Sequence, residues 1–258
     1  MDVTKLVLNS FKYPFRNIKK LPIICILFIL ICIVPFGMLF DNRYVVIIGV
    51  IAFFAFILIV PGYLLSIVKI GSIGSSAMPS LSLVNNIYDS IKVLFLRFVY
   101  MIVPVGVFFI SLTMVGPASI NLLFDLKILE FLAATGLMFI VVLVTFIVFE
   151  FLLFFAKARM AYFNSLSEAL KINKVIGDIR FIGLFTIIKW IIIMAILINV
   201  ISFVTSFVMS IPYVGFLIYG CIVIPIIESI SNYSLGLLYS NIAKNNADYT
   251  YRRISGLN

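Results

Sequence analysis

The sequence contains no histidine, three cysteines and few charged residues. Without histidine, the chain cannot form imidazole-based zinc or haem sites, Ser-His or Cys-His nucleophile pairs, or imidazole proton relays. Cys25, Cys32 and Cys221 lie in apolar runs, so we interpret them as buried thiols and expect no disulfide framework. The motifs of zinc proteases, serine hydrolases, P-loop enzymes and dinucleotide-binding enzymes are missing as well. We therefore expect no catalytic residues, no metal site, no cofactor and no enzymatic activity.

Charged residues make up only 11% of the chain, whereas hydrophobic residues make up 64%. Soluble domains average about 25% charged and about 45–50% apolar residues. Both differences indicate a chain that is embedded in lipid. No polar stretch is long enough to form a separate water-soluble core, so we predict a single membrane domain over residues 1–240 and a polar C-terminal tail over 241–258.

Apolar runs long enough to cross a bilayer recur along the whole domain, since a hydrocarbon core of about 30 Å needs roughly 20 residues. We predict six spans, at residues 21–40, 44–68, 94–115, 130–155, 181–209 and 213–240. The segments 1–20, 69–97 and 156–180 are basic and amphipathic, which is typical of helices at the membrane interface. Within the last of them, Ser165 and Glu168 have the spacing of a capping box at a helix N-terminus. The predicted fold class is all-α, a polytopic membrane helical bundle of about six transmembrane helices with short amphipathic interfacial helices.

The positive charges are distributed unevenly around the predicted spans. Most of the 19 lysines and arginines lie in the three amphipathic segments and the tail, whereas the alternate loops contain only Arg43 and Lys127. The positive-inside rule then predicts a multi-pass protein of the cell membrane with a cytoplasmic N-terminus and a cytoplasmic C-terminus. We interpret the net charge of +9 as attraction to the lipid bilayer, in particular to anionic inner-leaflet lipids, and expect no nucleic acid partner. Assembly into a homo-oligomer stays open.

The ends of the three returning spans resemble one another. Two leucines are followed by a lysine in each, at Leu64-Leu65 with Lys69, Leu152-Leu153 with Lys157, and Leu237-Leu238 with Lys244. One interpretation is a threefold internal repeat, in which each unit is a basic interfacial helix followed by a hairpin of two spans. The alternative is chance similarity among leucine-rich span ends.

Glu150, Lys189 and Glu228 are the charged residues that lie well inside predicted spans, and they form our candidate intramembrane polar site. A charge at the bilayer centre costs about 2.5–3.5 kcal/mol on insertion scales, so such residues usually face partners or water. One hypothesis is an ion, proton or substrate path in which Lys189 is balanced by Glu150 or Glu228. The alternative is that Lys189 and Glu150 reach the headgroups, while Glu228 is protonated or bonded to Ser229, Ser231 or Asn232.

Several short motifs, spread over nearly the whole chain, carry a family resemblance. They are Phe11-Lys-Tyr-Pro14-Phe, Gly62-Tyr-Leu-Leu65, Pro79, Asp89-Ser-Ile-Lys92, Ser167-Glu-Ala-Leu170, Ile211-Pro212 with Gly215, and Gly236-Leu-Leu-Tyr239. In this order they resemble an uncharacterised family of archaeal multi-spanning membrane proteins defined by a domain of unknown function. The acidic, Trp-containing stretch that usually follows the Pro79 position in that family is replaced here by Ser80-Leu-Ser-Leu-Val-Asn-Asn. The layout is also similar, more distantly, to the membrane domain of glycerophosphodiester phosphodiesterases, and neither resemblance supplies catalytic residues.

Two functions are compatible with these features. The first is a non-enzymatic membrane scaffold or envelope-associated protein, with its basic interfacial helices on the inner leaflet. The second is a small transporter or channel that uses Lys189, Glu150 and Glu228. A water-lined cavity that reaches these side chains would favour the transporter, and a lipid-facing Glu228 would favour the scaffold.

Overall fold

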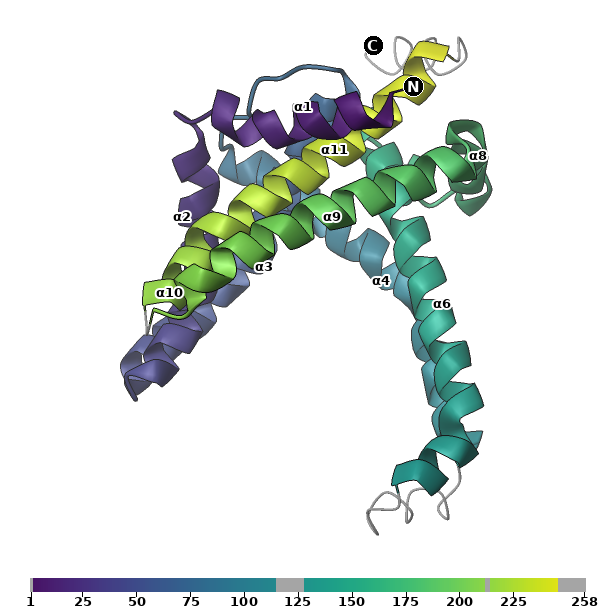
Figure 1. Ribbon diagram of the computed structural model, residues 1–258, viewed down its shortest axis with the longest axis horizontal. Helices are drawn as coiled ribbons and strands as arrows, with labels where there is room; N and C mark the ends of the chain where they lie inside the picture. The colour runs from purple at the N-terminus through teal and green to yellow at the C-terminus, as the bar shows by residue number, and fades with distance from the viewer. Residues whose placement is uncertain (1, 115–127, 212–213, 246–258) are drawn as a thin grey trace.

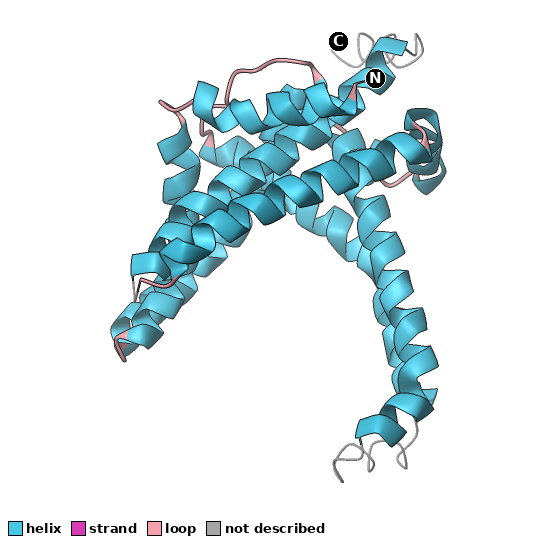
Figure 2. Cartoon of the chain, viewed as in Figure 1, coloured by secondary structure: helices cyan, strands magenta, loops and turns pink. Residues whose placement is uncertain are grey.

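The computed structural model describes residues 2–114, 128–211 and 214–245, and this part of the chain is helical with short connections (Figure 2). The elements are α1 (Val3–Arg16), α2 (Leu21–Leu39), α3 (Arg43–Ser72), α4 (Leu83–Met114), α6 (Ile128–Phe163), α7 (Leu166–Ala169), α8 (Ile172–Ile182), α9 (Leu184–Met209), α10 (Val214–Ile218), the π-helical turn η1 (Tyr219–Val223) and α11 (Ile224–Asn245). The predicted all-α class is confirmed.

In the described part of the chain, six helical segments are long and apolar enough to cross a membrane, as the sequence predicts. They are α2, α3, α4, the part Thr135–Phe163 of α6, α9, and the continuous stretch Val214–Ser240 formed by α10, η1 and α11. The structure differs from the expectation at the third span, because α4 begins at Leu83 and joins the amphipathic residues to the span without a break. On the amphipathic part of α4, Asp89 pairs with Lys69 of α3 and with Lys92.

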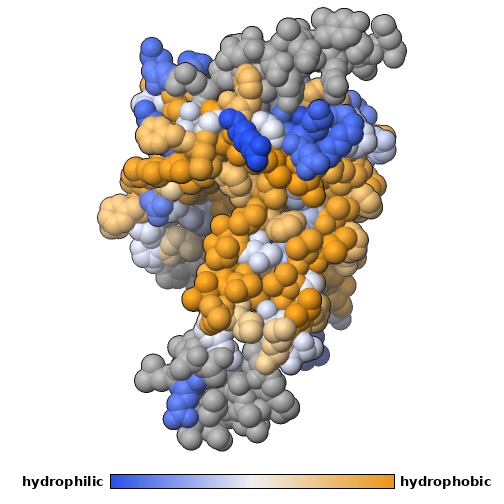
Figure 3. Space-filling model, turned by 90° about the vertical axis from the view of Figure 1, so that its right-hand side faces the viewer, coloured by the Kyte–Doolittle hydropathy of each residue, from blue (hydrophilic) through white to orange (hydrophobic). Residues whose placement is uncertain are grey.

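The helices form two legs that separate from a common end of the molecule (Figure 1). We call the group of α2, α3, α9, α10, η1 and α11 the broad leg, and the pair of α4 and α6 the narrow leg. The common end, which we call the α1 face, carries α1, the start of α4, the α7–α8 segment and the end of α11. Figure 3 shows the side of the narrow leg, with hydrophilic residues gathered toward the α1 face and hydrophobic residues covering the part below.

Helix α3 lies at the centre of this arrangement and contacts α2, α4, α6 and α11. Two of its crossings depend on glycine. A Cβ atom on Gly62 would lie 1.9 Å from the carbonyl oxygen of Asn86 in α4, and a Cβ on Gly236 of α11 would lie 2.4 Å from that of Val68. Small residues of this kind let membrane helices approach closely enough for backbone contact. The Gly62 crossing therefore joins the two legs, and the Gly236 crossing holds α3 and α11 together within the broad leg.

The order of elements fits the threefold unit that the sequence suggests. Interfacial α1 precedes the α2–α3 hairpin, the first turns of α4 precede the α4–α6 hairpin, and α8 precedes the α9–α11 hairpin. In the first two units, a cation near the end of the returning helix pairs with an aspartate about 20 residues later, but in the second unit this cation is Arg159. Lys157, the cation of the predicted repeat, donates to Asn232 instead. Lys69 Nζ lies 2.6 Å from Asp89 Oδ2, and an Arg159 guanidinium nitrogen lies 2.8 Å from Asp178 Oδ2. The side chain of Lys244, the third cation of the predicted repeat, lies outside the described residues.

Candidate functional site

The three predicted site residues lie on three different helices, with Glu150 on α6, Lys189 on α9 and Glu228 on α11. Within the described part of the chain, each has its own surroundings and no hydrogen bond or ion pair joins any two of them. The arrangement in which Lys189 is balanced directly by Glu150 or Glu228 is therefore not the one in this structure.

Glu150 pairs with Arg97 of α4 inside the narrow leg. The Arg97 guanidinium donates to Glu150 Oε1 at 2.9 Å, and the two side chains are 61% and 48% exposed, respectively. Our sequence interpretation counted Arg97 with the basic interfacial segment and missed this partner. Arg97 lies near one end of the predicted third span, and Glu150 lies a similar distance from the end of the antiparallel fourth span. This similar depth in the membrane could have indicated the pair from the sequence.

Glu228 belongs to a chain of hydrogen bonds that crosses from α11 to α6. The amide of Asn232 donates to Glu228 Oε2 at 3.0 Å, and Lys157 Nζ donates to the amide oxygen of Asn232 at 2.6 Å. The bond between Glu228 and Asn232 is the one that the alternative interpretation proposes. Lys157 is the part that the sequence did not suggest, because it was assigned to the interfacial segment.

Both polar groups involve α6. The Glu150–Arg97 pair joins α6 to α4, and the Lys157–Asn232 bond joins α6 to α11. We call Arg97, Glu150, Lys157, Glu228 and Asn232 the junction cluster. It contains two cations and two anions, so its charges balance within the protein. Chemically, the cluster can hold the two legs together and can offer a hydrogen-bonded route from α6 to α11.

Lys189 lies apart from the junction cluster. Its side chain is exposed on α9, next to the buried Trp190, and its charge acts on the carboxylate of Asp2 at the start of α1. The hydrogen bond from the Lys5 backbone N–H is the main cause that lowers the pKa of Asp2, and Lys189 adds to it. Lys189 thus adds a minor attraction to the start of α1, and its predicted reach toward the headgroups stays a prediction.

A buried ionic network near the α1 face escaped the sequence interpretation. Arg159 of α6 is 1% exposed, and its guanidinium donates to Asp178 of α8 and to both the backbone oxygen and the carboxylate of Glu168. The hydroxyl of Tyr239 in α11 donates to the same Asp178 oxygen. Four elements therefore meet at one guanidinium, and a buried pair with its hydrogen bonds completed in this way serves to fix their packing.

The capping box predicted at Ser165 and Glu168 is wrong. Ser165 is the N-cap of α7 but makes no side-chain capping bond, and its hydroxyl lies 3.0 Å from that of Ser167. The Glu168 carboxylate is held by Arg159 and Lys171. Partial burial of Glu168 acts to raise its pKa, but the hydrogen bonds from Lys171 and Arg159 outweigh it and leave the pKa below the ordinary value.

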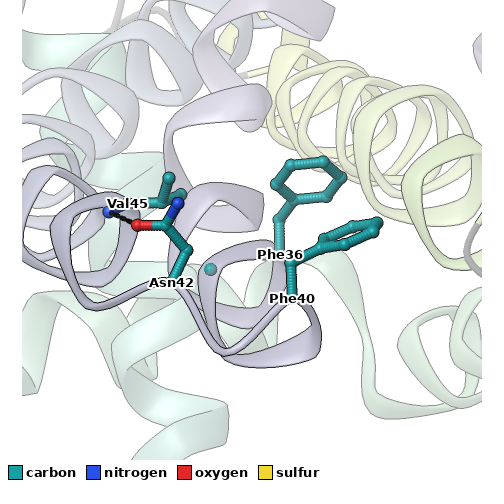
Figure 4. Close-up of a pocket in the computed structure, with 5 residues that line it drawn as sticks. Phe36, Phe40, Asn42 and Val45 are labelled. Atoms are coloured by element: carbon teal, nitrogen blue, oxygen red, sulfur yellow. Dashed lines mark hydrogen bonds between the residues drawn. The ribbon is translucent and has the colours of Figure 1, made fainter.

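A pocket of about 240 Å³ lies at the α2–α3 turn, far from these charges (Figure 4). Its lining residues are Phe36, Gly37, Phe40, Asn42 and Val45. The Asn42 side-chain oxygen accepts hydrogen bonds from the backbone N–H groups of Tyr44 and Val45, so it caps α3. The pocket is therefore an apolar recess beside a helix cap and contains no catalytic constellation. Among the side chains that the structure describes, no three Cys, Asp or Glu residues form a group that could hold a metal ion.

Comparison with known proteins agrees with the resemblance seen in the sequence. The profile of a family described as "Protein of unknown function (DUF4013)" matches residues 45–213, from the start of α3 to the turn after α9. No curated protein and no solved structure matches the chain. The matched region covers most of the spans and includes Glu150, Lys189, Arg97 and Lys157. The chain therefore belongs to the DUF4013 family of proteins of unknown function.

Proposed function

We propose that this protein is a non-enzymatic scaffold of the cell membrane, whose α1 face lies in the cytoplasmic leaflet and gathers anionic lipids. The observation that carries the proposal is the two-sided character of α1. One side is buried against the bundle through Val3, Leu6 and Tyr13. The other side exposes lysine and arginine beside large apolar side chains, namely Lys5, Leu8, Lys12, Phe15 and Arg16.

Such an exposed side suits the boundary between headgroups and acyl chains. Leu8 and Phe15 are 51% and 52% exposed, and apolar side chains of this size bind below the headgroups while lysines reach up to the phosphates. Each lysine or arginine near an anionic membrane surface contributes about 1 kcal/mol of attraction.

The end of α8 repeats the pattern on the other side of the α1 face. Lys174 and Arg180 are exposed, while Val175 and Asp178 are buried against the protein. Phe181, near the end of α8, and Phe185, at the start of α9, are 49% and 84% exposed. Two separate basic and aromatic surfaces thus support a protein that contacts the same leaflet at two points.

The thermal unfolding temperature of the whole protein in lipid nanodiscs tests this proposal. We expect the unfolding temperature to be higher in phosphatidylcholine discs that contain one quarter phosphatidylglycerol than in phosphatidylcholine alone, because lipids that bind only the folded state stabilise it. Replacing Lys5, Lys12, Arg16 and Lys19 with glutamine should remove most of the difference, and high salt should weaken it. Equal unfolding temperatures in both kinds of disc would contradict the proposal.

A small transporter or channel is the second candidate, and the hydrogen-bonded chain from Lys157 through Asn232 to Glu228 favours it. A proton or cation path through the junction cluster would need Glu228 to change partners. In proteoliposomes with an internal pH dye, this candidate predicts a proton leak that Glu228→Gln abolishes. The scaffold predicts no leak with either the wild-type protein or the variant.

A further inference from the structure

An apolar groove of about 320 Å³ lies between α1, α9 and the start of α11. Its walls include Phe11 and Phe15 of α1, Val200 and Val204 of α9, Val223 of η1 and Ile226 of α11. The hydroxyl of Thr205, which also lines the groove, donates to the carbonyl oxygen of Ile201 within its own helix. The other lining side chains are apolar, so the groove offers an occupant no free side-chain hydrogen-bonding group. The part of an occupant that lies in the groove must therefore be apolar.

The groove meets a positive charge at its α1 end. Phe11 and Phe15 are four residues apart and their rings lie 5.4 Å from each other, and Lys12 precedes Phe15 by three residues. Residues with these spacings are neighbours on a helix surface, so Lys12 lies beside the Phe15 wall of the groove. Lys12 is exposed, and in the described structure no acidic side chain pairs with it. The surface is therefore apolar in the groove and cationic at the rim. It complements an anionic lipid, which has apolar acyl chains and a negatively charged headgroup.

A backbone irregularity shapes one wall of the groove. The π-helical turn η1 ends at Val223, which lines the groove, and its Gly220 packs directly on Cys32 of α2. Turns of this kind are rare and often occur at functional sites. Here the wider turn directs one side of the sixth span onto α2 and the other side onto the groove.

We propose that the groove beneath α1 binds one anionic phospholipid, with an acyl chain against Phe15, Val204 and Ile226 and the phosphate at Lys12 Nζ. This site deepens the proposed scaffold function and rests on it, since it requires α1 to lie in the anionic leaflet. The groove site differs in two ways from the general attraction of the α1 face to anionic lipid. It has defined apolar walls for the acyl chain, and one lysine, Lys12, contributes more to lipid binding than the others.

Native mass spectrometry of the full-length protein in detergent can test the site, with phosphatidylglycerol or phosphatidylcholine as the added lipid. The wild-type protein should bind its first phosphatidylglycerol more tightly than its first phosphatidylcholine. Lys12→Gln should weaken the first phosphatidylglycerol about fivefold, the effect of one nearby charge, whereas Lys5→Gln should change it less than about twofold.

A second pair of variants tests the groove itself. Val204→Trp should fill the groove and abolish the tight first binding event, while Ile196→Trp, on an exposed part of α9 outside the groove, should not. Both substituted side chains are exposed, so an unchanged unfolding temperature verifies that the fold is intact.

The outcomes separate the site from the proposed function. Tight binding that survives Val204→Trp, or equal losses from Lys12→Gln and Lys5→Gln, would overturn the groove site while leaving general attraction to anionic lipid in place. Equal affinity for both lipids in the wild-type protein, with no effect of either lysine, would overturn the site and the scaffold proposal together.

Discussion

Gly62 of α3 lies against the backbone of α4, and its own N–H donates to the hydroxyl of Ser90 at 2.7 Å. A methyl group at this position would lie 1.9 Å from the carbonyl oxygen of Asn86 and 2.8 Å from the N–H nitrogen of Ser90. We expect Gly62→Ala to force the helices apart and to cost roughly 1–3 kcal/mol of unfolding free energy, by analogy with overpacked cores. The unfolding temperature in detergent measures the effect.

Gly106 provides the matched control, because a Cβ atom there would meet no atom within 4 Å. Gly106→Ala should leave the unfolding temperature unchanged or raise it slightly, since alanine favours helix more than glycine does. Equal effects of the two substitutions would show that the crossing of α3 and α4 is not close in the native protein.

Glu168 links stability to acid pH. Its carboxylate faces Arg159 of α6 and Lys171, and these contacts hold its pKa in the folded protein below the ordinary value of 4.5. The stabilisation is therefore complete above about pH 4.5 and is lost as pH falls through the lower pKa of the folded state. We expect the unfolding temperature of the wild-type protein to fall more steeply between pH 5 and pH 3 than that of Glu168→Gln. Parallel pH profiles would contradict this account.

Residue types alone could indicate which charges were unusual but not which charges would meet. Glu150, Lys189 and Glu228 stand out because they interrupt apolar runs. Arg97, which pairs with Glu150, and Lys157, which reaches Glu228 through Asn232, lie at the ends of such runs and look like ordinary interfacial cations. Pairing depends on which helices become neighbours, and that is decided by packing between segments far apart in the sequence.

Helix α1 packs on the bundle through buried Val3 and Leu6 and through one aromatic contact. The ring of Tyr13 stacks on that of Tyr233 in α11 with centroids 3.9 Å apart, and Tyr13 is 1% exposed. Its hydroxyl has no hydrogen-bond partner among the described residues, and burial raises the pKa of Tyr13 well above its usual range. The ring, and not the hydroxyl, should therefore hold α1 in place.

Tyr13→Ala should cost about 3–5 kcal/mol and increase hydrogen exchange in α1 more than in α3. Tyr13→Phe should keep the ring contact and match the wild-type protein, or exceed its stability slightly, because no hydrogen bond is lost. If Tyr13→Phe loosened α1 as much as Tyr13→Ala, the hydroxyl would have to make a bond that this structure lacks.

The existence of the spans could be predicted well from the sequence. The way in which helical segments join within a span could not. Apolar length is a local property, so α2, α3 and α9 follow directly from the runs that encode them. In α4 the interfacial and spanning parts form one helix, and the interfacial part is tied to α3 by the pairing of Asp89 with Lys69, a contact between segments that hydropathy does not reveal. The π-helical turn in the sixth span likewise depends on its packing and has no local signature that we recognised.

In the whole molecule, the described loops between helices lie at two opposite ends. The loop between α3 and α4 is tied to the end of α1, since Asn17 donates to the backbone oxygen of Ser76 at 2.9 Å and Lys20 donates to that of Met78 at 2.8 Å. The α2–α3 turn lies at the far end of the broad leg (Figure 1). The separation of the two legs was not predicted, because hydropathy gives no information on how hairpins are arranged.

Labelling of single cysteines tests the proposed orientation, in a background where Cys25, Cys32 and Cys221 are replaced with alanine. We expect a membrane-impermeant maleimide to label Arg43→Cys on intact cells and Ser76→Cys only after permeabilisation, because both positions are exposed but lie at opposite ends of the spans. The reverse pattern would place the α1 face outside the cell.

The lipid shell of the protein is the most direct test of the central claim that the α1 face gathers anionic lipid. The protein is extracted with its surrounding lipids by a styrene–maleic acid polymer from membranes of known composition, and the phosphatidylglycerol fraction of the shell is compared with that of the bulk. The account predicts enrichment around the wild-type protein, loss of enrichment when Lys5, Lys12, Arg16 and Lys19 become glutamine, and no change for Arg43→Gln at the opposite end. A wild-type shell with the bulk composition, or an equal loss with Arg43→Gln, would contradict it.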